Sequence, residues 1–360
     1  MKIAASVTID ADFWRGRRVL VTGHTGFKGA WLCLWLQSLG ARVTGMAAGV
    51  PTRPSLYELA RVGEQMEQVS ADIRDGPAVE RAIVTSRPEV VLHLAAQPFV
   101  RRSLREPVLT YEVNVIGTAN LLEAIRRAGG GVRAAVLVSS DKCYENDGRP
   151  SRRFVEGDPL GGADPYSSSK ACVELLTAAY RSSFLADGQT PRLATARAGN
   201  VIGGGDWGED RLLADAVRAV DSGQPLRVRN PAAVRPWQHV LSPLAGYLRL
   251  CEALWDGAAA ARPWNFGPRA GDERPVGWVV ERLAELWQGE LAWEPEQLSG
   301  PPEAGHLALD SAAAERQLGW RPACDLEEAL RLLVEWHRAH RRGEDVRAVS
   351  LAQVGLLAAS

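Results

Sequence analysis

The chain has 360 residues, with 42 Lys and Arg against 43 Asp and Glu, and 46% of its residues are apolar. These values are ordinary for a globular enzyme with one large domain or two modest ones. The formal net charge of -1 excludes a general electrostatic attraction to nucleic acid or to anionic membranes. We therefore expect neither of them as a partner.

The N-terminal segment and the cysteines both favour a cytoplasmic location. The segment MKIAASVTIDADFW has one Lys, a very short apolar run and two early Asp, which is a poor match to a signal peptide. No apolar run is long enough to span a bilayer. The five cysteines are scattered, odd in number and never in a CxxC pair. This pattern favours a reducing compartment over a disulfide framework or a zinc site, and we expect no bound metal.

The first element expected is a strand, a glycine-rich turn and a helix within Val19–Leu32. Gly23 would allow the tight turn, Gly26 would let the backbone approach phosphates, and Gly29 would let helix and strand pack closely. A strand that leads into such a turn and then a helix places a pyrophosphate at the helix N-terminus. The alternative is a glycine-rich turn without a ligand.

Strands and helices then alternate along the chain. Strands are expected near 42–46, 68–73, 90–94, 134–139 and 193–197, and helices over 77–86, 107–128 and 166–184. This order predicts an α/β protein with a doubly wound, Rossmann-type parallel sheet. The segments that leave the carboxyl ends of the strands should meet in one crevice. They are His24–Lys28, Asp72-Ile73, Ala95–Phe99, Ser140–Tyr144 and Gly199–Gly205.

The pattern loosens after about residue 200. We expect a dinucleotide-binding domain over 1–200, to which parts of 225–270 return. A smaller α/β lobe that binds substrate is expected over 201–340. Residues 341–360 have only weak turn and helix-cap signals and are expected to form a loosely held helix or a disordered tail.

Tyr166 and Lys170 form a second chemical motif, because residues four apart share one face of a helix. A nearby Lys stabilises phenolate and would lower the pKa of Tyr166 toward the range of a useful base. Ser140, at the end of a strand in the same crevice, can hydrogen-bond the reacting hydroxyl. The Tyr166–Lys170 spacing also occurs by chance on solvated helix faces. It indicates a catalytic pair here because the glycine-rich turn and Ser140 accompany it.

Together these motifs resemble the extended short-chain dehydrogenase/reductase family from Arg18 to about Pro322. Within that family they are most similar to the branch of CDP-glucose 4,6-dehydratases. The similarity rests on VTGHTGFKGAWL, LHLAAQPFVRRS, SSDKCYEN, DPYSSSKAC, RAGNVIGGGDW, VRPWQHVLSPLAGYL and WNFGP. In related dTDP-sugar and GDP-sugar dehydratases an acidic residue usually stands at the position of Lys142.

The resemblance implies NAD as cofactor and CDP-glucose as substrate. Tyr166 would take the proton of the 4-hydroxyl while hydride leaves C4 for NAD. Water would then leave across C5 and C6 with Asp141 as the acid, and hydride would return to C6. Lys142 would be either a neutral base or a cation that stabilises the enolate. Catalysis would thus involve Ser140, Asp141, Lys142, Tyr166 and Lys170.

The resemblance also implies binding residues and an assembly. The cofactor residues would be Gly23, Thr25, Gly26, Phe27, Lys28, Gly29, Asp72, Ile73, Leu94, Ala95, Ala96, Gln97, Asn114, Ser139, Tyr166 and Lys170. The sugar nucleotide would contact Gln97, Asn200, Arg211 and Arg235. A homodimer or a dimer of dimers would form through the helix over 107–128 and the helix that carries Tyr166.

Simpler interpretations of several residues stay open. Asp72 could cap the following helix, Asn114 could serve packing alone, and Arg211 could pair with Asp210 or Asp215 on the surface. His239 is expected to be structural, and Cys143 buried and inert. The second strand ends in GMAAGVPTRP without the acid that usually binds the ribose of NAD, and Arg53 lies close enough in sequence to meet a 2′-phosphate.

Two rival functions also stay open. A sugar-nucleotide 4-epimerase, or a dehydratase acting on another nucleotide sugar, would use the same Tyr166 and Lys170. An epimerase needs no acid or base for elimination, so Asp141 and Lys142 distinguish the two. A dinucleotide sensor without catalysis is disfavoured by the intact Ser140, Tyr166 and Lys170.

Overall fold

The alternation of strands and helices produces one large parallel sheet. The computed structural model describes residues 8–149, 152–185, 190–296 and 306–358. Among these residues seven strands pair in the order β11-β6-β5-β4-β1-β2-β3, all parallel. Their bounds are β1 Arg18–Thr22, β2 Arg42–Ala47, β3 Glu67–Ser70, β4 Val90–His93, β5 Ala134–Val138, β6 Arg192–Ala198 and β11 Pro263–Phe266. The expected doubly wound, Rossmann-type fold class is confirmed.

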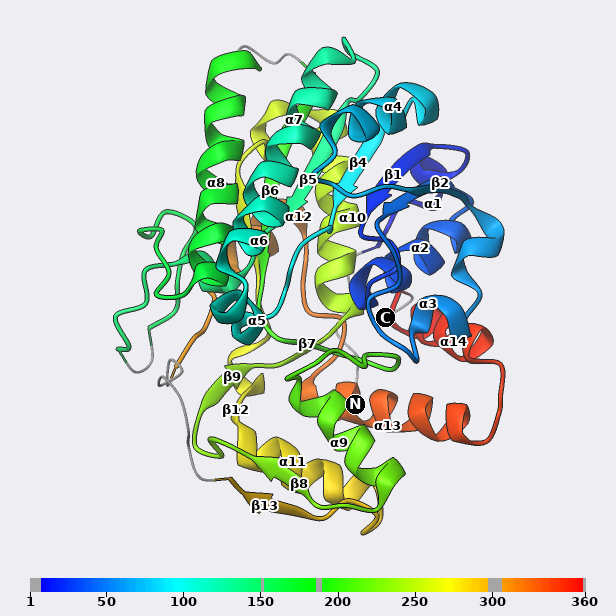
Figure 1. Ribbon diagram of the computed structural model, residues 1–360, viewed down its shortest axis with the longest axis vertical. Coiled ribbons are helices and arrows are strands. Elements are labelled where there is room, and N and C mark those ends of the chain that lie inside the picture. The colour runs from blue at the N-terminus through cyan, green and yellow to red at the C-terminus, as the bar shows by residue number, and fades with distance from the viewer. Residues whose placement is uncertain (1–7, 150–151, 186–189, 297–305, 359–360) are drawn as a thin grey trace.

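Helices cover both faces of this sheet (Figure 1). Helices α4 (Gly76–Ser86), α7 (Gly117–Arg127) and α8 (Pro165–Phe184) pack on one face, and α2 (Phe27–Ser38) and α10 (Leu241–Asp256) on the other. Alternate strand residues supply the two cores. Leu20 and Val91 belong to the first, and Val19, Val21 and Val90 belong to the second. A strand that is buried on both sides therefore reads as a continuous apolar run.

The helix expected over 107–128 is interrupted. It consists of α6 (Pro107–Tyr111), a π-helical turn over Glu112–Ile116 and α7. The turn contains Asn114, whose side chain is fully engaged with neighbouring segments. A π turn inside a helix often marks a functional site, and hydrophobic periodicity does not reveal one.

The segment after β6 builds three two-stranded sheets. They pair β7 (Val201–Ile202) with β10 (Gln238–His239), β9 (Val234–Pro236) with β12 (Glu273–Pro275), and β8 (Leu226–Val228) with β13 (Trp293–Pro295). Helices α9 (Leu212–Ser222) and α11 (Val276–Leu286) lie with β8 and β13 at the bottom of Figure 1. Strand β11 and helix α10, both within 225–270, belong to the large sheet and its cover. The boundary between residues 200 and 201 stays a prediction.

The C-terminal segment differs from the expectation of a loosely held tail. Helix α13 (Leu326–Arg341) is followed by α14 (Val346–Ala358), which packs against α13 and α2. Val346, Val354 and Leu357 are buried, and the Trp336 indole donates to Ser350 Oγ at 2.9 Å. The apolar side chains of α14 are therefore part of the main core. Gly343, with a φ of 73°, and Asp345, which accepts from the Arg347 nitrogen at 3.0 Å, mark the start of the helix.

Short helices complete the chain. They are α1 (Ala11–Trp14), α3 (Leu56–Leu59), α5 (Val100–Arg105) and α12 (Ala312–Leu318), with 3₁₀ turns over Val62–Gln65, Asp141–Cys143, Ala258–Ala260 and Ala270–Asp272. Within the described ranges no helix combines the length and the apolar character needed to cross a membrane.

Candidate active site

The glycine-rich turn has the geometry of a phosphate cradle. Gly23 has a φ of 73°, and a Cβ added there would lie 2.7 Å from the Ala95 nitrogen. A Cβ on Gly29 would lie 2.2 Å from the Gly23 carbonyl oxygen. Helix α2 begins after Gly26 without a side-chain cap and without an acid in its first turn. Its N-terminal amides are therefore available to an anion, which is the observation that fits a dinucleotide pyrophosphate.

A cavity of about 1040 Å³ begins at this turn and extends across the carboxyl edge of the sheet into the C-terminal lobe. This volume lies at the upper end of the range for small-molecule sites. With one exception, every residue predicted to bind cofactor or substrate or to act in catalysis lines it. The exception is Asn114. Within the described residues no group of His, Cys, Asp and Glu could hold a metal ion.

Asn114 does not line the cavity but contacts Gln97, which does. It is buried, and its Oδ1 accepts from the Gln97 nitrogen at 2.8 Å. Its Nδ2 donates to the Gln97 carbonyl at 3.1 Å and to Ser169 Oγ at 2.9 Å. The amide thus ties the loop after β4 to α8, which is more than the packing role considered from the sequence.

The structure also shows the positions of Asp72 and Arg53, which the sequence places near the expected adenine and ribose sites. Asp72 does not cap helix α4, because Asp75 does so by accepting from the Ala78 nitrogen. The Arg74 guanidinium lies 2.8 Å from the Asp72 carboxylate, and this hydrogen-bonded pair lowers the pKa of Asp72. Arg53 is largely exposed, pairs with Glu58 at 3.6 Å and does not line the cavity. The structure therefore gives Arg53 no position toward a 2′-phosphate.

Tyr166 and Lys170 project from the first turns of α8 into the cavity. Asp164 caps the helix by accepting from the Ser167 nitrogen at 2.9 Å, and the Tyr166 nitrogen donates to Ser103 Oγ at 3.1 Å. Lys170 Nζ donates to the Val138 carbonyl at 3.1 Å. These bonds fix the helix start against both β5 and α5.

Burial dominates the protonation of this pair. It raises the pKa of Tyr166 to about 12, although a hydrogen bond with Ser140 and the charge of Arg211 oppose the rise. It lowers the pKa of Lys170 to about 8, against the opposing charge of Glu174. The expected lowering of the Tyr166 pKa is therefore not observed, because desolvation of the phenolate outweighs its positive neighbours.

Ser140, Asp141 and Lys142 form the turn that follows β5. Ser140 Oγ accepts from the Lys142 nitrogen at 3.2 Å and donates to Asp141 Oδ1 at 3.0 Å. Asp141 is 3% exposed, and its Oδ2 has no hydrogen-bond partner among the described residues. Burial raises the pKa of this carboxyl, while Lys142, Ser140, Lys28 and Arg235 oppose the rise. A carboxyl with a raised pKa is suited to deliver a proton.

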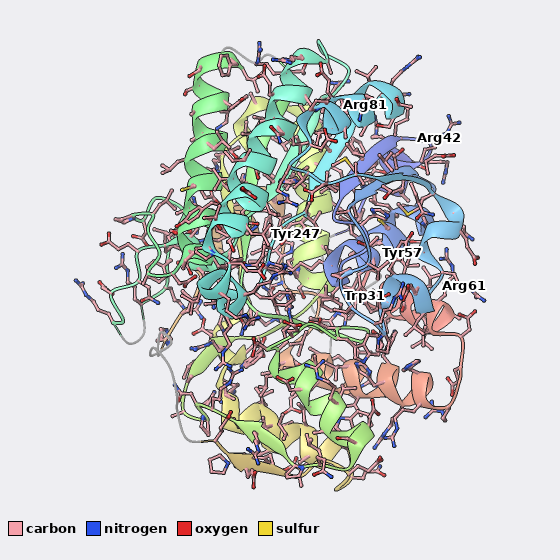
Figure 2. All side chains as sticks on the ribbon, in the orientation of Figure 1. Trp31, Arg42, Tyr57, Arg61, Arg81 and Tyr247 are labelled. Atoms are coloured by element: carbon pink, nitrogen blue, oxygen red, sulfur yellow. The ribbon has the colours of Figure 1, made fainter. Side chains whose placement is uncertain are left out.

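Lys28 lies closer to this chemistry than its expected role at the pyrophosphate turn implied. Its Nζ donates to the Tyr247 hydroxyl at 3.4 Å, and Figure 2 shows Tyr247 near the centre of the molecule. Burial lowers the pKa of Lys28 to about 7, with Arg211 and Lys170 adding to the effect and Asp141 opposing it. Sequence reasoning did not single out Tyr247, because this residue lies within an apolar helix whose residues are typical of a core.

The predicted substrate residues come from the loop after β4 (Gln97), the segments after β6 and β7 (Asn200 and Arg211) and β9 (Arg235). Arg211 lies 3.1 Å from Asp206, instead of pairing with Asp210 or Asp215 as considered from the sequence. Arg235 Nη1 donates to the Val234 carbonyl at 3.0 Å. Asn200 and both arginines line the cavity, and so do residues that sequence reasoning did not single out, namely Arg101, Asp206, Trp207, Arg229 and His337.

His239 and Cys143 are both fully buried. Burial lowers the pKa of His239 to about 3, and its ring meets the Trp31 indole edge-on at 6.1 Å. Burial also raises the pKa of the Cys143 thiol. Neither group therefore changes its charge near neutral pH.

Comparison with known proteins identifies the family. The model of the NAD dependent epimerase/dehydratase family matches residues 19–262. The chain belongs to this family. It is 45% identical over 355 residues to a CDP-glucose 4,6-dehydratase of Salmonella typhimurium, covering 96% of this chain and 97% of that one.

Solved structures of family members share the fold. A UDP-glucose 4-epimerase of Thermus thermophilus in complex with NAD superposes with a TM-score of 0.76 at 27% identity, covering 89% of this chain and 99% of that one. A dTDP-glucose 4,6-dehydratase of Streptomyces venezuelae with NAD bound gives a TM-score of 0.76 at 24% identity, covering 92% and 99%. Epimerases and dehydratases therefore share this architecture, and the fold alone does not choose between them.

Proposed function

We propose that this protein is a CDP-glucose 4,6-dehydratase, a hydro-lyase that uses NAD without net consumption. The observation that carries the proposal is the Asp141-Lys142 turn, which lines the same cavity as Tyr166 and Lys170. An epimerase needs only the second pair. The 45% identity over nearly the full length of the Salmonella enzyme supports the choice of CDP-glucose.

NAD fits the glycine cradle, where Gly23, Gly26 and Gly29 would lie against its pyrophosphate. Asp72 and Ile73 would flank the adenine, and Ala95, Ala96 and Gln97 would line the nicotinamide side. When bound, NAD would supply a hydride acceptor for C4, return that hydride to C6, and add a positive charge that favours the Tyr166 phenolate.

The protein's own groups would carry the proton transfers. Lys170 stabilises the phenolate form of Tyr166, which takes the proton of the 4-hydroxyl as C4 is oxidised and becomes a neutral phenol. The 4-keto group acidifies the proton on C5. Asp141 then protonates the departing 6-hydroxyl, so that one proton from C5 and one hydroxide from C6 leave as water. A hydride at C6 and a proton at C5 complete the product, CDP-4-dehydro-6-deoxyglucose.

Lys142 has two possible roles in this elimination. A neutral Lys142 would take the C5 proton directly, whereas a cationic Lys142 would stabilise the enolate. The charge of Lys142 opposes the rise in the Asp141 pKa, and this electrostatic influence supports the cationic role. In that case Asp141, Tyr166 or a bound water moves the C5 proton.

The test is a panel of CDP-, dTDP-, GDP- and UDP-hexoses incubated with NAD, with products identified by mass. Loss of water from CDP-glucose alone is the expected result. Faster turnover of dTDP-glucose would contradict the nucleotide assignment. A 4-epimer without loss of water would favour the epimerase, and no reduction of nicotinamide on mixing would favour a sensor.

We infer that the chain forms a homodimer through α6, the π turn and α8. Val108, Tyr111 and Ile116 are exposed on the first two elements, and Leu175 and Phe184 on α8. The Tyr111 hydroxyl lies 2.6 Å from Ser168 Oγ, so the two elements are adjacent. A second copy would bury their exposed apolar side chains in a four-helix contact, and two such dimers could associate further.

Light scattering on Ile116→Arg tests this assembly. We expect the variant to be monomeric, and the same change at Val84, which is equally apolar and 62% exposed on α4, to leave the dimer intact. A dimeric Ile116→Arg protein would contradict the inference.

All five cysteines are free thiols, which supports a reducing cytoplasmic location.

A further inference from the structure

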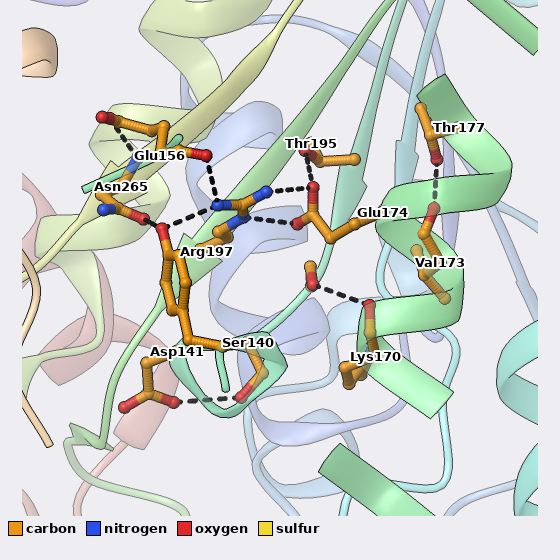
Figure 3. A network of polar contacts seen from close by, with 12 residues as sticks. Ser140, Asp141, Glu156, Lys170, Val173, Glu174, Thr177, Thr195, Arg197 and Asn265 are labelled. Atoms are coloured by element: carbon orange, nitrogen blue, oxygen red, sulfur yellow. Dashed lines mark hydrogen bonds and ion pairs between the residues drawn. The ribbon is translucent and has the colours of Figure 1, made fainter. Parts of the chain in front are cut away.

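A buried polar network joins the two elements that carry the proposed chemistry (Figure 3). At its centre Arg197, on β6, lies between Glu174 of α8 and Tyr144, the residue after the Asp141–Cys143 turn. Arg197 Nη2 donates to Glu174 Oε2 at 2.9 Å, and its Nε forms an ion pair with Glu174 Oε1 at 2.9 Å. Its Nη1 donates to the Tyr144 hydroxyl at 2.7 Å and to the Glu156 carbonyl at 3.0 Å. We refer to these groups as the Arg197 network.

Two hydrogen bonds of the network restrict the Tyr144 hydroxyl. It accepts from Arg197 and donates to Asn265 Oδ1 at 2.7 Å, so its direction is set from both sides. The Tyr144 ring also stacks on Phe154, with centroids 4.8 Å apart and planes at 14°. The hydroxyl therefore has a single orientation in which both bonds are made.

The network contributes more to the positions of its groups than to the stability of the fold. Tyr144, Glu174 and Arg197 are 1%, 4% and 2% exposed. An ion pair buried this deeply is often no more stabilising than apolar residues of similar volume, because both charges lose their hydration. Its specific contribution is therefore the fixed position of the groups that it connects.

The two ends of the network differ in how firmly they are otherwise held. Tyr166 and Lys170 sit on a twenty-residue helix whose start is fixed by Asp164, Ser103 and the Val138 carbonyl. The Asp141–Cys143 turn has only three residues. Beyond Ser140, its backbone accepts one bond, from the Gly161 nitrogen to the Cys143 carbonyl at 2.9 Å, and Cys143 packs in an apolar cluster with Tyr144, Phe154 and Ala171 of α8. Loosening Tyr144 should therefore displace the turn and leave the helix in place.

We propose that Tyr144, held by Arg197 and Glu174, is a positioning residue that fixes the Asp141-Lys142 turn against the Tyr166–Lys170 face. This inference rests on the proposed dehydratase function. Asp141 and Lys142 act in elimination, whereas oxidation at C4 uses Tyr166, Lys170 and Ser140, which precedes the turn. Tyr144 therefore controls the elimination step and leaves oxidation at C4 unaffected. The enzyme would thus have separate supports for its two half-reactions.

The experiment compares Tyr144→Phe with a matched control, Tyr180→Phe. The control also removes a tyrosine hydroxyl, but from a residue of α8 outside the Arg197 network. CDP-glucose and NAD are mixed with each protein. The near-ultraviolet absorbance of reduced nicotinamide reports oxidation, and the mass of the product reports elimination. For Tyr144→Phe we expect normal oxidation and a normal KM, with elimination slowed about tenfold to a hundredfold, the effect of misplacing a catalytic group by about 1 Å. Reduced nicotinamide should therefore accumulate.

A second variant tests whether the effect comes from the Arg197–Tyr144 contact or from general damage to the fold. Arg197→Lys keeps the buried charge but cannot contact Glu174 and Tyr144 together, and we expect the same accumulation. In the double variant the two effects should not add, because both act through one contact. Tyr180→Phe should behave like the unmodified protein.

Equal slowing of oxidation and elimination in Tyr144→Phe, or no slowing of either, would overturn the inference. Failure of the proposed function is a separate outcome. In that case the unmodified protein itself would release no water from CDP-glucose.

Discussion

Asp141→Asn should inactivate the protein and stabilise it at the same time. The Asp141 carboxyl is buried, and burial raises its pKa above the usual 3.8. Asn has nearly the same shape and still accepts from Ser140, but it cannot release a proton to the departing hydroxyl. Loss of a general acid typically slows a reaction by about a hundredfold to ten-thousandfold, and we expect this loss in elimination, with oxidation at C4 retained.

The stability change follows from the sign of the pKa shift. The folded-state pKa is raised, so the charged carboxylate destabilises the folded protein above the unfolded pKa, and this penalty disappears as the pH falls below it. Removing the charge relieves the penalty, although the new amide leaves one buried donor unpaired, at about 1–3 kcal/mol. We expect the relief of the charge penalty to be the larger effect near neutral pH, so that the Asn variant is more stable and its Tm is raised.

Thermal unfolding at neutral pH and at a pH below 3.8 measures this gain, and product mass measures the activity. The gain should be present at neutral pH and absent in acid. An Asn variant that is less stable at neutral pH, or that eliminates water at the normal rate, would refute the reasoning. It would mean that Asp141 is held as a charged partner of Lys142 and Lys28 and does not serve as an acid.

Three other changes test the remaining parts of the site. Tyr166→Phe removes the base, so oxidation and turnover should fall by about a hundredfold to ten-thousandfold while NAD still binds; near-normal turnover would exclude the phenolate as the base. Lys142→Arg keeps the charge, so appreciable dehydration with solvent deuterium at C5 supports the cationic role. If Lys142→Arg and Lys142→Met both fail in elimination yet still reduce NAD, Lys142 is the base. Gly29→Ala places a Cβ 2.2 Å from the Gly23 carbonyl oxygen, so calorimetry should show weakened NAD binding; unchanged affinity would show that the turn can shift.

The parallel sheet and most of the cavity could be predicted from the sequence because their signals are local. Apolar runs, glycines at three-residue steps and a Tyr and a Lys four residues apart each lie within a few residues of one another. Parallel topology then brings the strand ends to one edge. Local signals therefore predicted which segments meet.

Features that depend on packing between distant segments could not be predicted. The π turn that contains Asn114 depends on tertiary contacts with Gln97 and Ser169. The raised pKa of Tyr166 depends on burial, which a sequence motif does not measure. The Arg197 network joins residues 144, 174 and 197, whose separation leaves no recognisable spacing.

The most direct test of the central claim is the fate of the hydrogen on C4. CDP-glucose carrying deuterium at C4 is incubated with the protein and NAD, and the dehydrated product is examined by mass and NMR spectroscopy. Oxidation, elimination and reduction within one closed site should move the deuterium to C6 of the product. Deuterium that returns to C4, with no water lost, would contradict the account and indicate epimerisation.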